Sequence, residues 1–257
     1  MTGDAAEVVG VVDPTGRYHA AVSELPLSTR SAERVPGALV VIPGTAGWTD
    51  AALAASETGA AALVVAEPEF VPATELRALA QGLHIPLIIE RPLLRADVAG
   101  DAIDRRAGGS PRVLTVDGGA GEAGLLSVTR DAVGWLRVLA GGGLAVASSD
   151  GALALLQTEA GIAGTLTVTV TARPGPGWIR AHALGETITD VEIDGRAARV
   201  TTASAVGRLT SPTRFESSER LALRRAVAVL ADRDRSDDLG ELLADTDLVE
   251  RMPGLAP

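Results

Sequence analysis

Residues 38–65 read ALVVIPGTAGWTDAALAASETGAAALVV, and this stretch decides the fold of the first half of the chain. It holds two apolar runs, 38–42 and 61–65, and Gly59 ends an amphipathic segment between them. Short runs that are apolar throughout are typical of strands buried on both faces, and strands separated by helices pair in parallel. The stretch therefore predicts a parallel sheet with helices packed against it.

The same alternation extends on both sides, and it changes after Asp117. There a helix is followed by strand-like runs, and Thr alternates with apolar residues over 165–172, as in a sheet with one apolar face. Asp194-Gly195 is a tight-turn dipeptide between two such runs and predicts a hairpin. The further strands that we expect are 8–12, 85–89, 112–116, 144–148, 178–184, 187–193 and 198–202, and the helices are 49–58, 72–82, 96–105, 125–140, 218–232 and 237–252.

The sequence thus predicts an α/β domain over residues 1–117 and an α+β domain with a broad, mostly antiparallel sheet over residues 118–257. The boundary is set near Asp117 because the pattern of elements changes there.

Composition excludes several kinds of chemistry. The chain has 257 residues, with 33 acidic and 23 basic side chains, and every basic one is Arg because the sequence contains no Lys. Without Lys there is no Schiff base, and without Cys there is no thiolate nucleophile, disulfide or zinc-thiolate site. The three His residues are scattered, without the spacing of metal ligands, so no metal site is expected.

The charge distribution also limits the partners and the location. A formal charge of −10 with no basic cluster argues against nucleic acid as a partner. No run approaches the about 18 apolar residues of a membrane span. The first residues carry acids where a secretory signal needs positive charge, so we expect a cytoplasmic protein.

Polar residues at strand ends and on one helix are the candidate site residues. Glu67 and Glu90 each end a predicted strand, where the crevice of α/β proteins binds ligands, and a solvated position is equally compatible with both. Ser127 and Asp131 lie four residues apart and share a helix face. Asp13 follows the first strand, and the residues favour a simple turn for it.

The string Gly119-Ala-Gly-Glu-Ala-Gly124 matches the pattern of a dinucleotide-binding loop. Asp150 would then take the place of the ribose-binding acid. Glycine is abundant here, with 29 residues, and Glu122 would lie beside the phosphates, so a structural glycine segment before the following helix is the stronger interpretation.

These strings together resemble the Gfo/Idh/MocA oxidoreductases. Residues 38–43 and 51–59 are similar to that family's "D-x-V-x-I-x-T/P … A-x-x-A-G", and residues 61–68 to its V-x-V-E-K-P segment. Residues 121–141 resemble its "G-G-G-A-L-L-D-x-G-x-H" helix, and residues 154–166 its entry into the second sheet. The resemblance implies an NAD(P)-binding Rossmann domain followed by a sheet domain through which the family dimerises.

The departures from the family decide the functional expectation. Residues 7–14 resemble its second strand, which makes Asp13 the ribose-binding acid and the first domain a truncated Rossmann-like sheet without its glycine-rich first βα unit. The family's catalytic Lys falls on Glu67, or on Arg91 if Glu90-Arg91-Pro92 is the equivalent segment, and its Asp and His fall on Ser127 and Asp131. The residues that would handle a proton are therefore replaced.

Three hypotheses follow from this resemblance. The first is a catalytically degenerate member that needs no cofactor and acts as a small-molecule binder or as a homo- or hetero-oligomeric partner of an active oxidoreductase, through its second sheet. The second is an NAD(P)-dependent sugar or polyol oxidoreductase with Glu67 or Asp131 as base. The third rests on residues 22–103, which also resemble the ligand-sensing domain of PucR-type regulators and predict no antiparallel sheet after Asp117.

Overall fold

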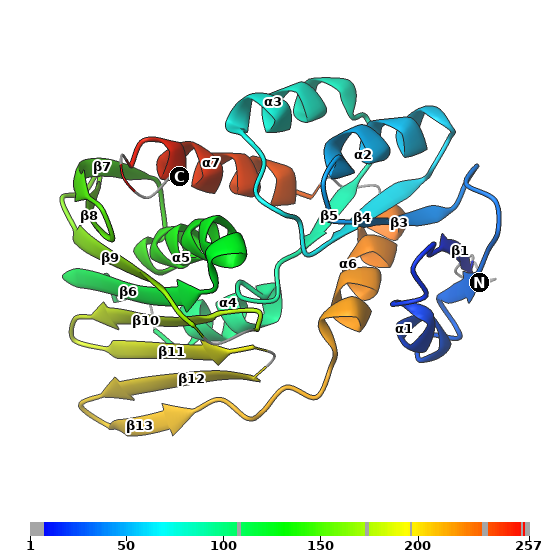
Figure 1. Cartoon of the computed structure of the whole chain (residues 1–257). Helices are drawn as coiled ribbons and strands as arrows, with labels where there is room; N and C mark the ends of the chain where they lie inside the picture. The colour runs from blue at the N-terminus through cyan, green and yellow to red at the C-terminus, as the bar shows by residue number, and fades with distance from the viewer. Residues whose placement is uncertain are drawn as a thin grey trace. The chain divides into compact units, whose positions relative to one another are not determined.

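The structure, a computed structural model, describes residues 8–106, 109–172, 175–195, 197–232, 236–252 and 254. It divides into two compact units (Figure 1). The first unit comprises residues 1–91 and 215–243, and the second comprises 92–214 and 244–257. In this division the first unit's first segment ends at Arg91, whereas the sequence pattern places a domain boundary near Asp117, and the later segment 215–243 also belongs to the first unit.

The first unit is built on a parallel five-stranded sheet in the order β2-β1-β3-β4-β5, as the apolar runs predict. Residues on alternate sides of β3 enter two separate cores. Leu39 and Val41 pack with α1 and α6, while Val40 and Ile42 pack with residues of α2, α3 and α7. The elements are β1 (Val9–Val12), α1 (His19–Ser23), β2 (Thr29–Ser31), β3 (Leu39–Pro43), α2 (Trp48–Glu57), β4 (Ala62–Ala66), α3 (Ala73–Gly82), β5 (Leu87–Glu90), α6 (Ser218–Asp232) and the first part of α7 (Asp238–Glu250), whose residues from 244 on are assigned to the second unit.

The position of β1 corrects one expectation from the resemblance. β1 lies between β2 and β3, which is the place of the first strand in a doubly wound sheet, and not of the second. The sequence pattern misses this because β2 has only three residues, two of them exposed, so no apolar run reveals it. A first βα unit is present, but Asp13-Pro14-Thr15-Gly16 follows its strand in place of a glycine-rich sequence.

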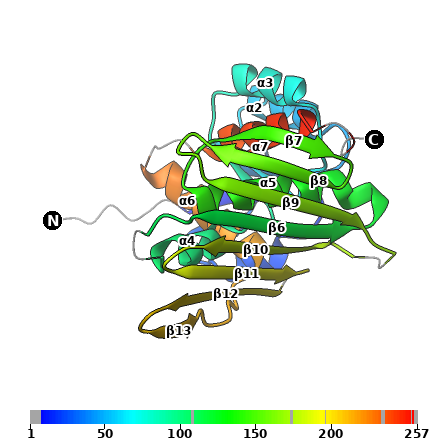
Figure 2. The same ribbon diagram turned by 90° about the vertical axis from the view of Figure 1, so that its left-hand side faces the viewer.

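The second unit contains an eight-stranded sheet in the order β13-β12-β11-β10-β6-β9-β8-β7 (Figure 2). β6 and β9 pair in parallel, and the other recorded pairs of this sheet are antiparallel, including the predicted hairpin of β11 and β12. This sheet contradicts the PucR-like hypothesis. Its strands are β6 (Val113–Ala120), β7 (Leu144–Asp150), β8 (Leu153–Thr158), β9 (Ala163–Val170), β10 (Trp178–Leu184), β11 (Ile188–Asp194), β12 (Ala197–Ser204) and β13 (Gly207–Thr210).

One face of this sheet is covered by α4 (Ala96–Asp104) and α5 (Leu125–Ala140). In β9, Leu166 and Val168 are buried, whereas Thr165 and Thr167 are partly exposed, as the alternation predicts. The strand expected at 112–116 in the first domain is β6, which lies in the middle of this second sheet. From Val113 to Gly118 its burial alternates from residue to residue, because helices cover only one of its faces.

Candidate functional site

The carboxyl edge of the parallel sheet brings together the acidic residues that the sequence singles out. Asp13 follows β1, Glu67 follows β4, and Glu90 is the last residue of β5. Because β4 and β5 are neighbours in the sheet, with Ala66 opposite Glu90, the two glutamates lie at adjoining strand ends. This is the edge at which open α/β sheets bind ligands.

Arg17, which the sequence analysis did not single out, joins these acids. Its Nη2 atom donates to Glu67 Oε1 at 2.6 Å and to Glu90 Oε1 at 3.0 Å, and its Nε atom donates to Glu219 Oε1 at 3.2 Å. Burial works to lower the pKa of Arg17, but the contacts with Glu67 and Glu90 outweigh burial and raise that pKa. One guanidinium therefore holds three carboxylates.

Glu90 is the most deeply buried member of this group, with 4% of its surface exposed. Its second carboxylate oxygen accepts the Tyr18 hydroxyl at 2.5 Å. Burial raises the pKa of Glu90 even though bonds from Tyr18, Ser218 and Arg17 favour the charged form. Burial and the adjacent Glu90 charge also raise the pKa of Tyr18, so its hydroxyl acts as a donor.

The Asp13 carboxylate is bound by the backbone of its own loop. Oδ1 accepts the Thr15 N–H at 3.0 Å and the Thr15 hydroxyl at 2.7 Å, and Oδ2 accepts the Tyr18 N–H at 2.7 Å. Burial alone would raise the pKa of Asp13, but the N–H groups of Tyr18 and Thr15 and the Thr15 hydroxyl lower it. A fixed negative charge thus lies directly after β1.

This loop does not fit the pyrophosphate of a dinucleotide. A pyrophosphate needs free N–H groups at the start of a helix that follows the first strand. Here Asp13 already takes the N–H groups of Thr15 and Tyr18, and Pro14 has no N–H to offer. The helix that follows, α1, has only five residues, and the Asp13 carboxylate would repel a phosphate.

Glu67 also has an uncommon backbone conformation. Its φ is +50°, a left-handed value that non-glycine residues rarely adopt. The neighbouring Gly44 packs so closely that a Cβ atom there would lie 2.4 Å from the Ala66 carbonyl oxygen and 2.5 Å from that of Glu67. The Gly44 N–H donates to the Ala66 oxygen at 2.9 Å, so β3 and the end of β4 are tied together. Tight backbone contact thus fixes the direction of Glu67.

Ser127 and Asp131 lie on α5 in the second unit, and the cluster around Arg17 belongs to the first. Ser127 is partly buried. Asp131 is buried and forms an ion pair with the Nε atom of its neighbour Arg130 at 3.3 Å. The segment 119–124 ends β6 and leads through a short 3₁₀ turn, η1 (Glu122–Gly124), into α5.

The residues that sequence reasoning missed are Arg17, Tyr18 and Glu219. Arg17 and Glu219 are 202 positions apart, so no local pattern connects them. Tyr18 could have been noticed in the sequence, because it is the only Tyr of the chain.

Comparison with solved structures gives matches over nearly the whole chain. The dehydrogenase GnnA from Acidithiobacillus ferrooxidans, a UDP-N-acetylglucosamine 3-dehydrogenase, superposes with a TM-score of 0.70 at 13% identity, over 97% of this chain and 98% of that one. A dehydrogenase from Chromobacterium violaceum gives 0.71 at 13% identity, over 96% and 94%. These neighbours are oxidoreductases of the Gfo/Idh/MocA type. The chain has the Gfo/Idh/MocA fold.

A third match extends the comparison to a ligand-bound structure. KijD10, a 3-ketoreductase from Actinomadura kijaniata solved with TDP-benzene and NADP, superposes on the Gfo/Idh/MocA fold of this chain with a TM-score of 0.64 at 13% identity, over 96% of this chain and 97% of that one. By sequence, no family model and no curated protein matches. At such identities the likeness shows the fold.

Within the described ranges, no helix combines the length and the apolar character of a membrane span, and no group of three or more His, Cys, Asp or Glu side chains could hold a metal ion.

Proposed function

We propose that this protein is a catalytically degenerate Gfo/Idh/MocA-like protein that acts as a partner or regulatory subunit, or as a small-molecule binder, without transferring hydride. The observation that carries the proposal is the Asp13 carboxylate, which takes the N–H groups of Thr15 and Tyr18 where a cofactor pyrophosphate would bind. We therefore expect no NAD(P) in the working protein. A cytoplasmic location belongs to the same proposal.

The residues at the implied catalytic positions support this function. Oxidation of an alcohol needs a group that accepts the hydroxyl proton while the hydride leaves. Glu67 stands at the position that the resemblance gives to the catalytic Lys, and its carboxylate is bound to Arg17. Ser127 and Asp131 stand at the positions of its Asp and His, and Asp131 is paired with Arg130. Neither carboxylate is free to act as the family's Lys and His would.

The second sheet supports a role in assembly. Among the described residues one of its faces carries no helix, and two large apolar side chains on that face, Leu153 and Leu155, are 47% and 44% exposed. Apolar groups gathered on one face favour a partner that covers them. The proposal thus includes a homo-oligomer or a hetero-oligomer with an active oxidoreductase, formed through this face.

A cofactor-binding experiment tests the proposal. Thermal unfolding of the purified chain is followed with and without millimolar NADPH and NADH, with a dehydrogenase of the same fold as positive control. A ligand at 100 times its dissociation constant adds about 2.7 kcal/mol of stability. We expect no shift for this chain and a clear one for the control. A saturable shift would overturn the proposal.

One observation favours the alternative of an active NAD(P)-dependent sugar or polyol oxidoreductase. A cleft of about 690 Å³ beside the end of β2 is lined by Arg30, Glu33 and Arg34. In dinucleotide-binding folds an acid or an Arg near this strand end contacts the ribose or its phosphate. If NADPH binds, turnover with sugar or polyol substrates should be lost in Glu67→Gln or in Asp131→Asn, which would identify the base.

A further inference from the structure

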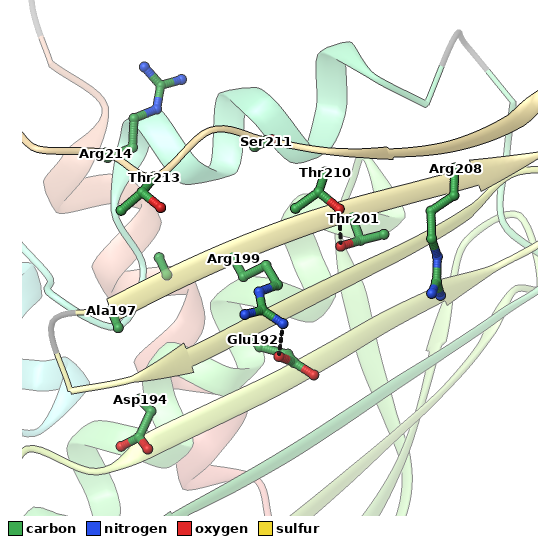
Figure 3. Close-up of a pocket in the computed structure, with 11 residues that line it drawn as sticks. Glu192, Asp194, Ala197, Arg199, Thr201, Arg208, Thr210, Ser211, Thr213 and Arg214 are labelled. Carbon is green, nitrogen blue, oxygen red and sulfur yellow. Dashed lines mark hydrogen bonds and ion pairs between the residues drawn. The ribbon is translucent and has the colours of Figure 1, made fainter.

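A hollow of about 580 Å³ lies over β11, β12 and β13, on the face of the second sheet opposite α4 and α5, which is called the open face below (Figure 3). Its volume is that of a small-molecule site, which is commonly about 300–1,000 Å³. Ser127 and Asp131, the candidate residues of this unit, are on α5 and therefore belong to the covered face. The hollow is thus a second place at which this chain can receive a ligand.

The register of β11 and β12 sets the charges of the hollow. Glu192 and Asp194 alternate with buried residues of β11, and Arg199 precedes a buried residue of β12, so all three side chains point to the open face. Glu192 is directly opposite Arg199 across the two strands. Carboxylates on one strand therefore adjoin a guanidinium on the next.

The contact between Arg199 and Glu192 is loose. Nη1 of Arg199 lies 3.8 Å from Oε2 of Glu192, which is longer than a hydrogen bond (Figure 3). The two side chains are 68% and 53% exposed, and an exposed ion pair of this kind contributes little free energy. Separating the two groups to admit a ligand therefore costs little.

Threonine hydroxyls lie beside this pair. Thr201 follows Arg199 on the same face of β12 and is opposite Thr210 of β13. Their hydroxyl oxygens are 3.3 Å apart, and this bond uses one of the two hydroxyl hydrogens, so the other is available to a ligand. Figure 3 shows Arg208 beyond the two hydroxyls, where it lies 3.6 Å from Asp190. The hollow therefore offers partners to a polar side chain as well.

The segment after β13 forms a wall of the hollow. The Ser211 N–H donates to the Val200 carbonyl at 2.8 Å, so this segment continues alongside β12. The Arg214 guanidinium then donates to both carboxylate oxygens of Asp101 on α4, at 2.6 and 3.2 Å. These bonds fix the wall, so the hollow is formed before a ligand arrives.

We propose that this hollow binds a free α-amino acid with a polar side chain, as its zwitterion, with the ligand's carboxylate on Arg199 and its ammonium on Glu192. Charge-assisted hydrogen bonds to the ligand then replace the loose contact between these two side chains. A dianion fits less well, because Glu192 and Asp194 repel it and the chain has a formal charge of −10. A simple cation is repelled by Arg199 and Arg208.

This inference rests on the small-molecule role in the proposed function, and names a ligand class and a place for it. The place differs from the apolar patch proposed for assembly. Leu153 and Leu155 are on β8, and β10, β6 and β9 lie between β8 and β11 in the sheet. Binding of an amino acid and assembly can therefore be measured independently.

Isothermal titration calorimetry of the full chain with L-serine, L-glutamine and L-glutamate tests the inference. We expect saturable binding of at least one of them. Its N-acetyl derivative lacks the ammonium charge, and its α-carboxamide lacks the carboxylate charge. Each should bind at least about tenfold more weakly than the parent amino acid, because one hydrogen-bonded charge is lost.

Variants place the ligand in the hollow. Arg199→Gln and Glu192→Gln should each weaken binding at least about tenfold, because each leaves one charge of the ligand without its partner. Arg30→Gln removes an exposed guanidinium of the first unit and, as the matched control, should bind like the wild type. Circular dichroism verifies that the variants are folded.

Four outcomes would each overturn the inference. They are no binding of any of the three amino acids at millimolar concentration, equal binding of the N-acetyl derivative or the α-carboxamide, wild-type affinity in Arg199→Gln and Glu192→Gln, and a loss of binding in Arg30→Gln. NADPH binding is measured separately. A chain that binds NADPH contradicts the proposed function, whereas a chain that binds no amino acid contradicts only this site.

Discussion

The Nη2 atom of Arg17 lies 2.6 Å from Oε1 of Glu67, at the position that the resemblance gives to a catalytic Lys. In place of a free amine next to a substrate, this edge of the sheet has a carboxylate held by a guanidinium. The same guanidinium also binds Glu90 and Glu219. Arg17 therefore links the end of β4, the end of β5 and α6 within the first unit, and this role is structural.

The variant Arg17→Ala tests the structural role of Arg17. Three carboxylates would lose their cation, and two of them, Glu90 and Glu219, are buried. Breaking a buried pair costs about 3–5 kcal/mol, and the 28% exposure of the Arg17 side chain reduces this to about 2–4 kcal/mol. Urea unfolding measures the loss. Arg17→Lys keeps the charge but not the planar fork and should lose less. Equal stability of Arg17→Ala and the wild type would contradict the structural role.

The buried Glu90 predicts a pH dependence of stability. Its pKa in the folded state is raised above the ordinary value of 4.5, so the folded protein holds this proton more tightly than the unfolded chain does. The stabilising contribution is complete below pH 4.5 and is lost as the pH rises through the folded pKa. The wild type should therefore lose stability relative to Glu90→Gln as the pH rises above 4.5. If the difference in the free energy of unfolding between the wild type and Glu90→Gln does not change with pH over this range, the prediction is wrong.

The elements with strong local signals were predictable from the sequence. α5 begins and ends where predicted, because the helix pattern stops at Gly141, whose φ of +73° is left-handed. α6 also has the predicted bounds, 218–232. The three-residue β2 and the five-residue α1 were not predicted, since elements so short show no periodicity. Their omission made β1 look like a second strand.

The candidate site was predictable only in part. Glu67 and Glu90 were candidates because acids at the ends of parallel strands share one edge. Their partners were not, because Arg17 reaches Glu219 across 202 positions, and only the packing of α6 against the sheet brings them together. Asp13 was expected to bind a ribose or form a turn, and the structure shows a turn in which its carboxylate accepts backbone N–H groups.

Asp13→Asn tests the strength of that turn. Asp13 uses one oxygen for the Thr15 N–H and the other for the Tyr18 N–H, whereas Asn has one acceptor oxygen and an NH₂ group that would face one of these donors. The variant should therefore lose about 1–3 kcal/mol at neutral pH. The folded pKa of Asp13 is lowered, so this advantage is present above the ordinary value of 3.8 and is lost as the pH falls through the folded pKa. Unfolding of both proteins between pH 2 and 7 measures it. If the difference in the free energy of unfolding between the wild type and Asp13→Asn does not shrink at low pH, the charge of the carboxylate is not its cause.

Two buried threonines on the covered face of the second sheet predict a stabilising change. Thr189 and Thr202 are opposite each other on β11 and β12, and the hydroxyl of each is buried without a hydrogen-bond partner in the described structure. An unsatisfied buried polar group costs about 1–3 kcal/mol, and Val has nearly the same shape. Thr189→Val should therefore raise the free energy of unfolding by about 1–2 kcal/mol. Thr201→Val, on the open face, is the control and should change stability by less than about 0.5 kcal/mol. A destabilised Thr189→Val protein would mean that the hydroxyl finds a partner in solution, such as a bound water.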